Sequence, residues 1–252
     1  MAVPLTTLVE EADRYLASAK IADYCPNGLQ VEGRPQVMRI VSGVTASQAL
    51  LDAAVDARAD LVLVHHGYFW KGENPCITGM KQRRLKTLLQ HDISLLAYHL
   101  PLDLHADVGN NVQLARQLDI TVEGPLDPSN PKIIGLVGSL AEPLSPRDFA
   151  RRVQDVMGRE PLLIEGSPMI RRIGWCTGGG QGYIDQAIAA GVDLYLSGEA
   201  SEQTFHSARE NDISFIAAGH HATERYGVQA LGDYLARRFA LEHLFIDCPN
   251  PI

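Results

Sequence analysis

Short apolar runs alternate with amphipathic stretches along most of the chain. The apolar runs span four to six residues and are rich in valine, isoleucine and leucine, as is typical of buried strands. They cover residues 39–43, 60–64, 93–98, 133–137, 162–165, 172–176, 193–196, 213–218 and 244–247. The stretches between them have apolar residues at helical spacing, over residues 48–58, 81–90, 111–118, 147–157, 184–190, 201–210 and 225–239. Strands that alternate with helices predict an α/β fold.

Residues that break regular structure divide the chain. The densest run of prolines, glycine and small polar residues spans 124–131, where turns are favoured. We therefore place a domain boundary there. A first α/β domain covers residues 1–126 and is completed by residues 211–252, and a second covers residues 127–210. One helix start beyond this boundary is clearly marked, since Ser145 is a good N-cap and Pro146 suits the first helical position.

The sequence contains an internal repeat. Residues 39–66 align without a gap on residues 172–199, and a second block, 92–97, aligns on 212–217. Charged residues are among the identities: Arg39 matches Arg172 and Asp60 matches Asp193. Because a shared apolar pattern alone does not produce such identities, we predict two interlinked α/β domains built from a duplicated β-α-β unit.

Composition narrows the class of protein. The 252 residues are 46% hydrophobic and 21% charged, with a net charge of −8, which suits a globular protein with a sizeable core. The acidic balance argues against nucleic acid as a partner, because binding by bulk charge needs a basic face. No apolar run approaches the ~20 residues that cross a bilayer, and no secretory signal opens the chain. We therefore expect a cytoplasmic protein without a membrane partner.

The four cysteines do not indicate a structural metal site or disulfides. Cys25, Cys76, Cys176 and Cys248 lie far apart, and none belongs to a Cys-x-x-Cys pair. This spacing argues against a zinc ribbon and against a disulfide framework. We interpret them as reduced thiols.

Metal-type side chains gather where predicted strands end. They are His65 and His66 after the strand at 60–64, His99 and Asp103 after 93–98, and His220 and Glu224 after 213–218. Functional groups of open α/β sheets collect at the ends of strands. Imidazole together with carboxylate suits a borderline divalent ion. The placement therefore predicts a metal site.

Spacing indicates how these side chains can share ions. His220 and Glu224 are four residues apart, so both project from one face if a helix has begun by His220. His221 is an alternative that the spacing to Glu224 disfavours. Adjacent residues on a strand point to opposite sides, so His65 and His66 can serve different ions of a pair. Two ions with open positions would bind water, which then becomes a nucleophile at neutral pH.

Two further segments each admit two interpretations. Residues 177–182 (TGGGQG) lie between a strand and a helix, where they suit either a phosphate contact or a tight turn with positive φ. Residues 68–73 (YFWKGE) offer aromatic faces that either stack on a heterocycle or anchor the loop or a subunit contact. We interpret four other histidines as structural: His91, His105, His206 and His243.

Three segments together resemble one protein family. They are HHGYFWKGE at 65–73, YHLPLD at 98–103 and GHHATERYG at 219–227. With the glycine cluster, the likeness covers essentially the whole chain. The chain resembles the bacterial YbgI-like family, whose members are also called NIF-three-like proteins or GTP cyclohydrolase 1 type 2 homologs. The resemblance implies the NIF-three-like fold and a dinuclear metal site.

The resemblance also implies roles for single residues. By match to the family's motifs, the metal ligands would be His65, His66, Asp103, His220 and Glu224, with Glu224 as a bridge. They would hold two divalent ions, which the sequence does not identify among zinc, iron, manganese and nickel. His99 would carry a proton or support a ligand. Family members form hexameric toroids built from dimers, so we expect a homohexamer.

Three functions are compatible with such a site. The first hypothesis is a dinuclear-metal-dependent hydrolase that acts on a nucleotide or related heterocycle, and by resemblance this would be a GTP cyclohydrolase-like opening of the guanine five-membered ring. The second is a metal-dependent phosphoesterase, because the same ions would clamp a phosphate. The third is a non-catalytic, metal-binding toroidal scaffold or regulator. We favour an enzyme with a small-molecule substrate.

Overall fold

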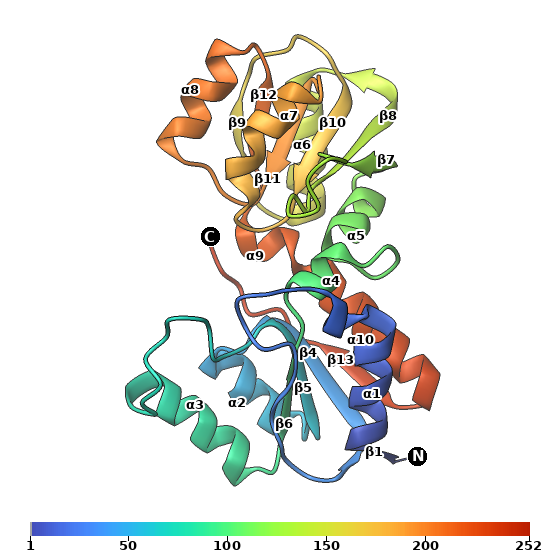
Figure 1. The fold of residues 1–252 in the computed structure, drawn as a ribbon, viewed down its shortest axis with the longest axis vertical. Helices are drawn as coiled ribbons and strands as arrows, with labels where there is room; N and C mark the ends of the chain where they lie inside the picture. Colours follow the sequence, from blue (N-terminus) through green and yellow to red (C-terminus); the bar gives the residue numbers. More distant parts are fainter. Residues whose placement is uncertain (1) are drawn as a thin grey trace. The chain divides into compact units, whose positions relative to one another are not determined.

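The computed structural model describes residues 2–252, which form two compact units (Figure 1). Unit 1 runs to Gly109 and includes Arg225–Pro249, and unit 2 comprises Asn110–Glu224 and Asn250–Ile252. The chain therefore leaves unit 1, builds unit 2, returns, and ends in unit 2. No helix within residues 2–252 combines the length and apolar character needed to cross a membrane.

The unit boundaries differ from those drawn from the sequence at 126/127 and 210/211. The run at 124–131 joins β7 (Thr121–Pro125) to β8 (Leu136–Leu144), which pair with each other inside unit 2. Likewise β12 (Ser214–Ala217) pairs with β11 (Leu194–Ser197) in unit 2 and does not complete unit 1. The breaker residues thus mark a loop within one sheet. The chain passes between units at Gly109–Asn110 and Glu224–Arg225 instead.

Unit 1 is a five-stranded sheet between helices. Its elements are β1 (Val3–Pro4), α1 (Leu5–Leu16), the 3-10 turn η1 (Ser18–Lys20), β2 (Gly28–Val31), β3 (Gln36–Val37), β4 (Arg39–Thr45), α2 (Gln48–Asp56), β5 (Leu61–His66), α3 (Gly79–Gln90), β6 (Ser94–Ala97), α4 (Leu100–Leu104), α10 (Arg225–Phe239) and β13 (Glu242–Phe245). The strand order of this sheet is β13-β4-β5-β6-β2, with β2 antiparallel and the others parallel. Strands β1 and β3 pair with each other in a separate two-stranded sheet.

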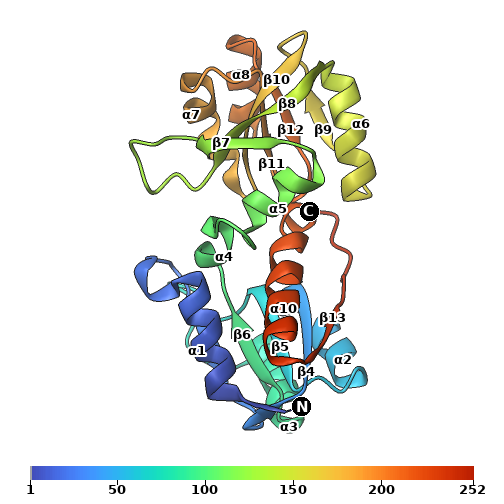
Figure 2. The ribbon, with the colours of Figure 1, turned by 90° about the vertical axis from the view of Figure 1, so that its right-hand side faces the viewer.

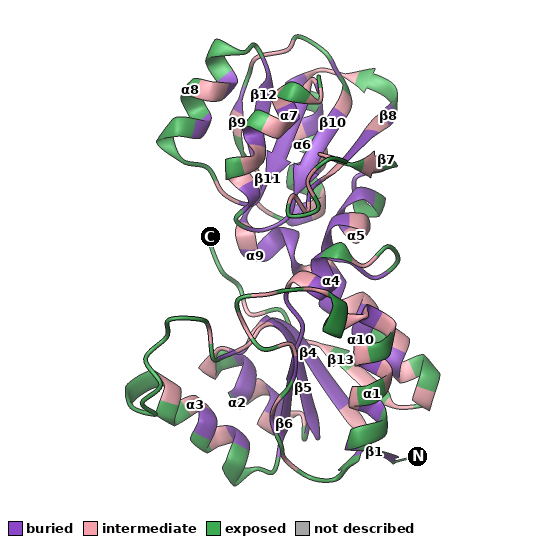
Figure 3. Cartoon of the chain, viewed as in Figure 1, coloured by how far each residue is buried: buried purple, intermediate pink, exposed green. Residues whose placement is uncertain are grey.

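Alternating side chains of β5 build two cores. Leu61 and Leu63 pack with α1 and α10 on one face, whereas Val62 and Val64 pack with α2 and α3 on the other. Figure 3 shows the central strands as buried and the outer helix faces as exposed. A strand buried on both faces reads as a continuous apolar run, as the sequence had shown.

Unit 2 has a six-stranded sheet. Besides β7, β8, β11 and β12 it contains α5 (Asn110–Gln117), α6 (Pro146–Met157), β9 (Leu162–Ile164), β10 (Ile170–Cys176), the 3-10 turn η2 (Gly180–Tyr183), α7 (Ile184–Ala189), α8 (Glu202–Glu210) and α9 (His220–Thr223). The strand order is β7-β8-β10-β11-β12-β9. Helix α6 covers one face, while α7 and α8 cover the other (Figure 2). The predicted cap is present, since the Ser145 hydroxyl accepts a hydrogen bond from Asp148 N.

Strand registers confirm the duplication. In unit 1, Ile40 pairs with Leu61, and in unit 2 the repeat partners Ile173 and Leu194 pair in the same way. The buried ends of the sheets also match, because Asp60 accepts hydrogen bonds from the backbone N–H groups at 38 and 39, and Asp193 from those at 171 and 172. The α/β fold with two interlinked, duplicated units is therefore confirmed. The sequence missed α1, α4, α9 and the strands β1, β2, β3 and β7, most of them short.

Candidate metal centre

Three histidines gather at the carboxyl end of the unit 1 sheet. His65 and His66 end β5, and His99 follows the neighbouring strand β6. One ring nitrogen from each of the three lies within 4.8 Å of the others. The rings of His65 and His66 are 4.5 Å apart, so the strand end brings them together rather than sending them to opposite sides as the strand alternation predicted. Because β5 and β6 are parallel neighbours, their carboxyl ends lie at the same edge of the sheet, and this brings the three histidines together.

The Nδ1 atom of each of these histidines is engaged by a neighbouring group. His65 Nδ1 lies 2.9 Å from the carbonyl oxygen of Tyr98, and His66 Nδ1 lies 3.2 Å from Thr45 Oγ1. Because a carbonyl oxygen accepts only, His65 donates Nδ1–H and carries its lone pair on Nε2. This second contact is the usual way in which a metal-binding imidazole is oriented.

Asp23 orients His99, and sequence reasoning missed it. The carboxylate lies 3.0 Å from His99 Nδ1 and also accepts hydrogen bonds from Asn27 Nδ2, Leu100 N and Tyr24 N. Burial alone would raise the pKa of Asp23, but the hydrogen bonds from His99 and Asn27 outweigh it and hold that pKa well below its usual range. Asp23 is therefore a fixed negative charge behind His99.

Unit 2 carries the remaining candidate histidine, His220, on α9. His220 Nδ1 lies 2.6 Å from Glu199 Oε1, and its Nε2 lies 3.2 Å from Glu224 Oε2. Helix α9 starts at His220, as the sequence required for the two to share a face. Burial of His220 lowers its pKa, but the hydrogen bonds and negative charges of Glu224 and Glu199 outweigh this and raise the pKa to about 9. Glu199 repeats for His220 what Asp23 does for His99.

Distances between donor atoms fit a divalent ion within each unit. Two ligands at ~2.1 Å from a tetrahedral ion are about 3.4 Å apart. In unit 1, His65 Nε2 and Asp103 Oδ1 are 3.6 Å apart, and in unit 2, the His220–Glu224 pair is 3.2 Å apart. Asp103 lies in α4 and is buried, with its backbone N–H donated to the carbonyl of His99. The candidate metal ligands thus form one donor group in each unit.

The glycine cluster is a tight turn. The N–H groups of Thr177 and Gly178 donate to Asn111 Oδ1 and Thr223 Oγ1, both at 3.0 Å, so neither is directed at an anion. Gly178 has φ +64°, a conformation that favours glycine. A Cβ atom at this position would overlap the carboxylate of Glu224. The turn therefore makes room for a candidate ligand.

The aromatic loop lies beside the unit 1 histidines. The Trp70 ring is 5.1 Å from that of His99 and 5.7 Å from that of Tyr24, centroid to centroid. Tyr68 anchors the loop, because it is buried and its hydroxyl donates to the carbonyl of Ala46. Phe69 is exposed. One loop thus serves both as an anchor and as an aromatic border of the site.

Histidines outside the cluster behave differently. His105 accepts from two backbone N–H groups at Nδ1 and contacts the carbonyl of Tyr15 through Nε2. His243 contacts Asp233 through Nδ1 and Ser42 through Nε2. Both ring nitrogens of each are used within the protein, as expected for structural residues. None of the four cysteines forms a disulfide within residues 2–252.

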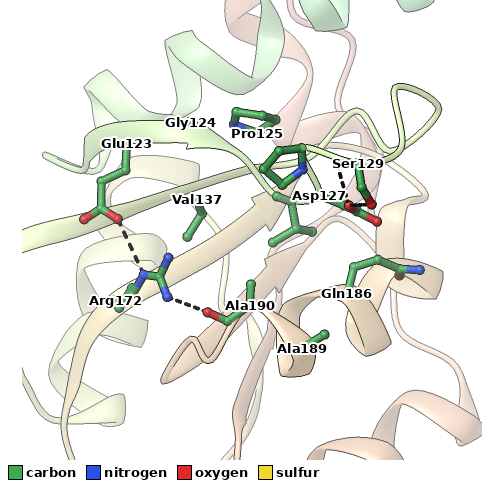
Figure 4. Close-up of a pocket in the computed structure, with 12 residues that line it drawn as sticks. Glu123, Gly124, Pro125, Asp127, Ser129, Val137, Arg172, Gln186, Ala189 and Ala190 are labelled. Atoms are coloured by element: carbon green, nitrogen blue, oxygen red, sulfur yellow. Dashed lines mark hydrogen bonds and ion pairs between the residues drawn. The ribbon is translucent and has the colours of Figure 1, made fainter.

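A cavity of about 600 Å³ in unit 2 has a different lining (Figure 4). It lies between the loop that follows β7 and the end of α7, and an ion pair between Arg172 and Glu123 forms one wall. The carboxylate of Asp127 accepts hydrogen bonds from the backbone N–H and the hydroxyl of Ser129 in the same loop. No histidine or cysteine lines this cavity, so it is not a candidate metal site.

The fold and these donor groups define an α/β protein with clustered metal-type side chains. The profile of the family described as Duf34/NIF3 (NGG1p interacting factor 3) matches residues 3–251. This chain belongs to that family.

Similar proteins and solved structures support this family assignment. The chain is 80% identical over 251 residues to the "GTP cyclohydrolase 1 type 2 homolog" of Pseudomonas aeruginosa, with 100% of both chains covered. It is 55% identical over 238 residues to the protein of the same name in Haemophilus influenzae, with 94% of each covered. A solved structure titled protein ybgI, of unknown function, superposes with a TM-score of 0.95 at 52% identity, covering 99% of this chain and 100% of that one. Another, from Thermus thermophilus, gives 0.90 at 34%, with 99% and 100% covered.

Proposed function

We propose that this protein is a dinuclear-metal-dependent hydrolase that acts on a nucleotide or a related heterocycle. The proposed ligands are His65, His66, Asp103, His220 and Glu224. Unit 1 supplies three of them and unit 2 supplies two.

The observation that carries the proposal is the anchoring of the histidine Nδ1 atoms. Tyr98 O, Thr45, Asp23 and Glu199 each engage the Nδ1 of one strand-end histidine. Such support is typical of metal-binding imidazoles, in which the second nitrogen faces the ion. His105 differs, because its Nδ1 accepts hydrogen bonds from two backbone N–H groups and its Nε2 contacts the carbonyl oxygen of Tyr15. Imidazole and carboxylate donors in these numbers suit zinc, iron, manganese or nickel.

Two of the proposed ligands lie close in the sequence to the points where the chain passes from one unit to the other. Glu224 is the last residue of this part of unit 2 and is joined by a peptide bond to Arg225 of α10 in unit 1. Asp103 lies six residues before the other crossing, at Gly109. By the family resemblance, Glu224 would be the ligand that the two ions share.

The reaction we propose is hydrolysis with His99 as the proton carrier. When bound, paired divalent ions supply Lewis acidity and lower the pKa of a water to near neutrality. His99 Nε2 would accept a proton from the attacking water and return it to the leaving nitrogen, while Asp23 stabilises the imidazolium through Nδ1. Trp70 and Tyr24 would border an aromatic base. The name shared by the curated relatives supports GTP as the first substrate to test.

Metal content tests the site. We expect about two divalent ions per chain in protein purified without added metal, and one or none after Glu224→Ala. His91→Ala is the matched control and should retain two ions, because His91 lies outside the cluster. Elemental analysis of all three proteins, with circular dichroism to check folding, gives the answer. If Glu224→Ala retains two ions, Glu224 does not bridge them. If the wild type holds no ion, the hydrolase proposal is overturned.

Product analysis separates the candidate functions. Loss of the guanine absorbance of GTP supports the ring-opening hydrolase. Release of inorganic phosphate with the base intact would point to a phosphoesterase instead. A fully metallated protein that turns over neither GTP nor a panel of phosphoesters would favour the scaffold. His99→Ala should lower turnover and leave the metal content unchanged.

Assembly belongs to the same proposal. The family resemblance supports a homohexamer built from dimers, with the metal sites facing a central cavity. Light scattering coupled to size exclusion should give the mass of six chains. A monomer at micromolar concentration would contradict this.

A further inference from the structure

Unit 2 contains a second cavity, of about 340 Å³, whose lining includes Glu199, the partner of the candidate ligand His220. It is lined by the strand-end residues Gly198 and Glu199, by Gly219, which precedes His220, and by Arg159. Gly219 has φ +103°, a conformation that favours glycine. Neither glycine has room for a Cβ atom, because the backbone of Gly178 and His220 packs against Gly198, and the Arg159 guanidinium packs against Gly219.

The guanidinium of Arg159 has donor capacity to spare. Arg159 follows the Gly158 C-cap of α6 and packs against Gly219, where an added Cβ atom would overlap Nη1. Its Nη1 is buried, and no acceptor within residues 2–252 takes a hydrogen bond from it. A desolvated cationic donor without an acceptor is unfavourable, because it has lost water and gained nothing in return. An anion in the cavity would relieve this.

The acidic residue of the cavity is already engaged. Glu199 Oε1 lies 2.6 Å from His220 Nδ1, and its Oε2 accepts a hydrogen bond from Gln181 Nε2 at 3.3 Å. Its charge is therefore directed at His220 and away from Arg159, with which it forms no ion pair of 4.0 Å or less. Arg159 is the group in this wall with unused hydrogen-bond donors.

We propose that this cavity is a phosphate-binding subsite in which Arg159 is the cationic donor. The planar guanidinium fork matches two phosphate oxygens at once, and this geometry distinguishes arginine from lysine. The subsite is lined by Glu199 and Gly219, which contact and precede His220, so it would hold the phosphate group of a substrate whose base meets the metal centre. Only this assignment to a nucleotide rests on the proposed function, since the anion site depends on Arg159 and the cavity alone.

Calorimetric titration with inorganic pyrophosphate tests the subsite. The titrations are run on full-length protein in the presence of a chelator, so that ions cannot bind the probe. We expect wild type to bind pyrophosphate and Arg159→Gln to bind it at least about tenfold more weakly. Arg159→Lys should lie between them, because it keeps the charge and loses the fork. The control is Arg151→Gln, which removes an exposed arginine of α6 that pairs with Asp148. It should bind pyrophosphate as the wild type does.

The outcomes separate this proposal from the previous one. Equal pyrophosphate affinity of wild type and Arg159→Gln, or no binding by wild type, overturns the subsite. In a second arm, Arg159→Gln should weaken GTP binding and leave guanosine binding unchanged; equal weakening of both would show an effect through the fold and overturn it too. If Arg159→Gln does not fold, the Arg159→Lys comparison decides. Pyrophosphate binding through Arg159, together with a wild type that is purified without any bound metal, would keep the subsite and overturn the hydrolase.

Discussion

Loss of the His220 proton should make the metal-free protein less stable as the pH rises. His220 has Glu224 on one ring nitrogen and Glu199 on the other, at 3.2 and 2.6 Å. Its pKa is raised from 6.5 to about 9 in the folded protein. The charged imidazole therefore stabilises the fold fully below pH 6.5, and this contribution is lost as the pH rises through 9.

The structure sets the size of the effect. At about 1.4 kcal/mol per pH unit of pKa difference, the raised pKa corresponds to roughly 3 kcal/mol. The His220 side chain is 29% exposed and that of Glu199 is 36% exposed. Solvent therefore screens the Glu199 part, and Glu199→Gln should remove about 1 kcal/mol of the total. Since metals bind neutral imidazole, the affinity for the ion held by His220 should rise up to tenfold per pH unit between pH 7 and 9.

Urea unfolding and proton NMR check both numbers. Metal-stripped wild type and Glu199→Gln are unfolded at pH 6, 7.5 and 9, and the histidine ring protons are titrated in parallel. The variant should show a lower pKa for His220 and a shallower fall of the unfolding free energy with pH. Other groups that titrate in this range are common to both proteins and cancel in the comparison. Identical pH dependence, or a His220 pKa at or below 6.5, would refute the reasoning.

Two further predictions concern the scaffold and the turn. Asp60→Ala should lower the free energy of unfolding by about 2–4 kcal/mol, because two backbone N–H groups and the guanidinium of Arg34 lose their acceptor; a loss under ~1 kcal/mol in urea unfolding would contradict this. Gly178→Ala should reduce metal content, because the new Cβ displaces the carboxylate of Glu224 and the positive φ is strained. Gly182→Ala, where the added Cβ meets open space, is its control, and equal metal content in the two variants would show that the turn does not seat the ligand.

Much of the fold was visible in the sequence because it is written in local patterns. The apolar runs of β4, β5 and β6 and their repeats are buried on both faces, so each reads as a continuous apolar segment. The identities of Arg39 with Arg172 and of Asp60 with Asp193 reflect hydrogen bonds that the two units share. Arg39 donates to the carbonyl oxygen of Ala57 at the end of α2, and Arg172 donates to that of Ala190 at the end of α7. Charged identities at fixed offsets thus carried structural information that the apolar pattern did not.

What the sequence did not show depends on contacts between distant residues. Asp23 and His99 are 76 residues apart, and Asp23 lies in a loop that has no periodicity. The pairing of Glu199 with His220 was not visible either, because the two residues are 21 positions apart. The crossings between units, at Gly109 and Glu224, lie next to ordinary helix sequence. The run of turn-favouring residues at 124–131 connects two paired strands of one sheet, so it does not mark a boundary between the units.

The two copies have kept their amino ends and diverged at their carboxyl ends. At the amino ends, Asp60 and Asp193 accept the same pair of backbone N–H groups. At the carboxyl ends, His66 of one copy aligns with Glu199 of the other, so an imidazole stands where the second copy has an acid that orients an imidazole. Duplication of a scaffold followed by divergence at strand ends changes chemistry without disturbing the core. If the ions are held as proposed, neither copy carries a complete set of ligands, and selection on the site would then act on both copies together.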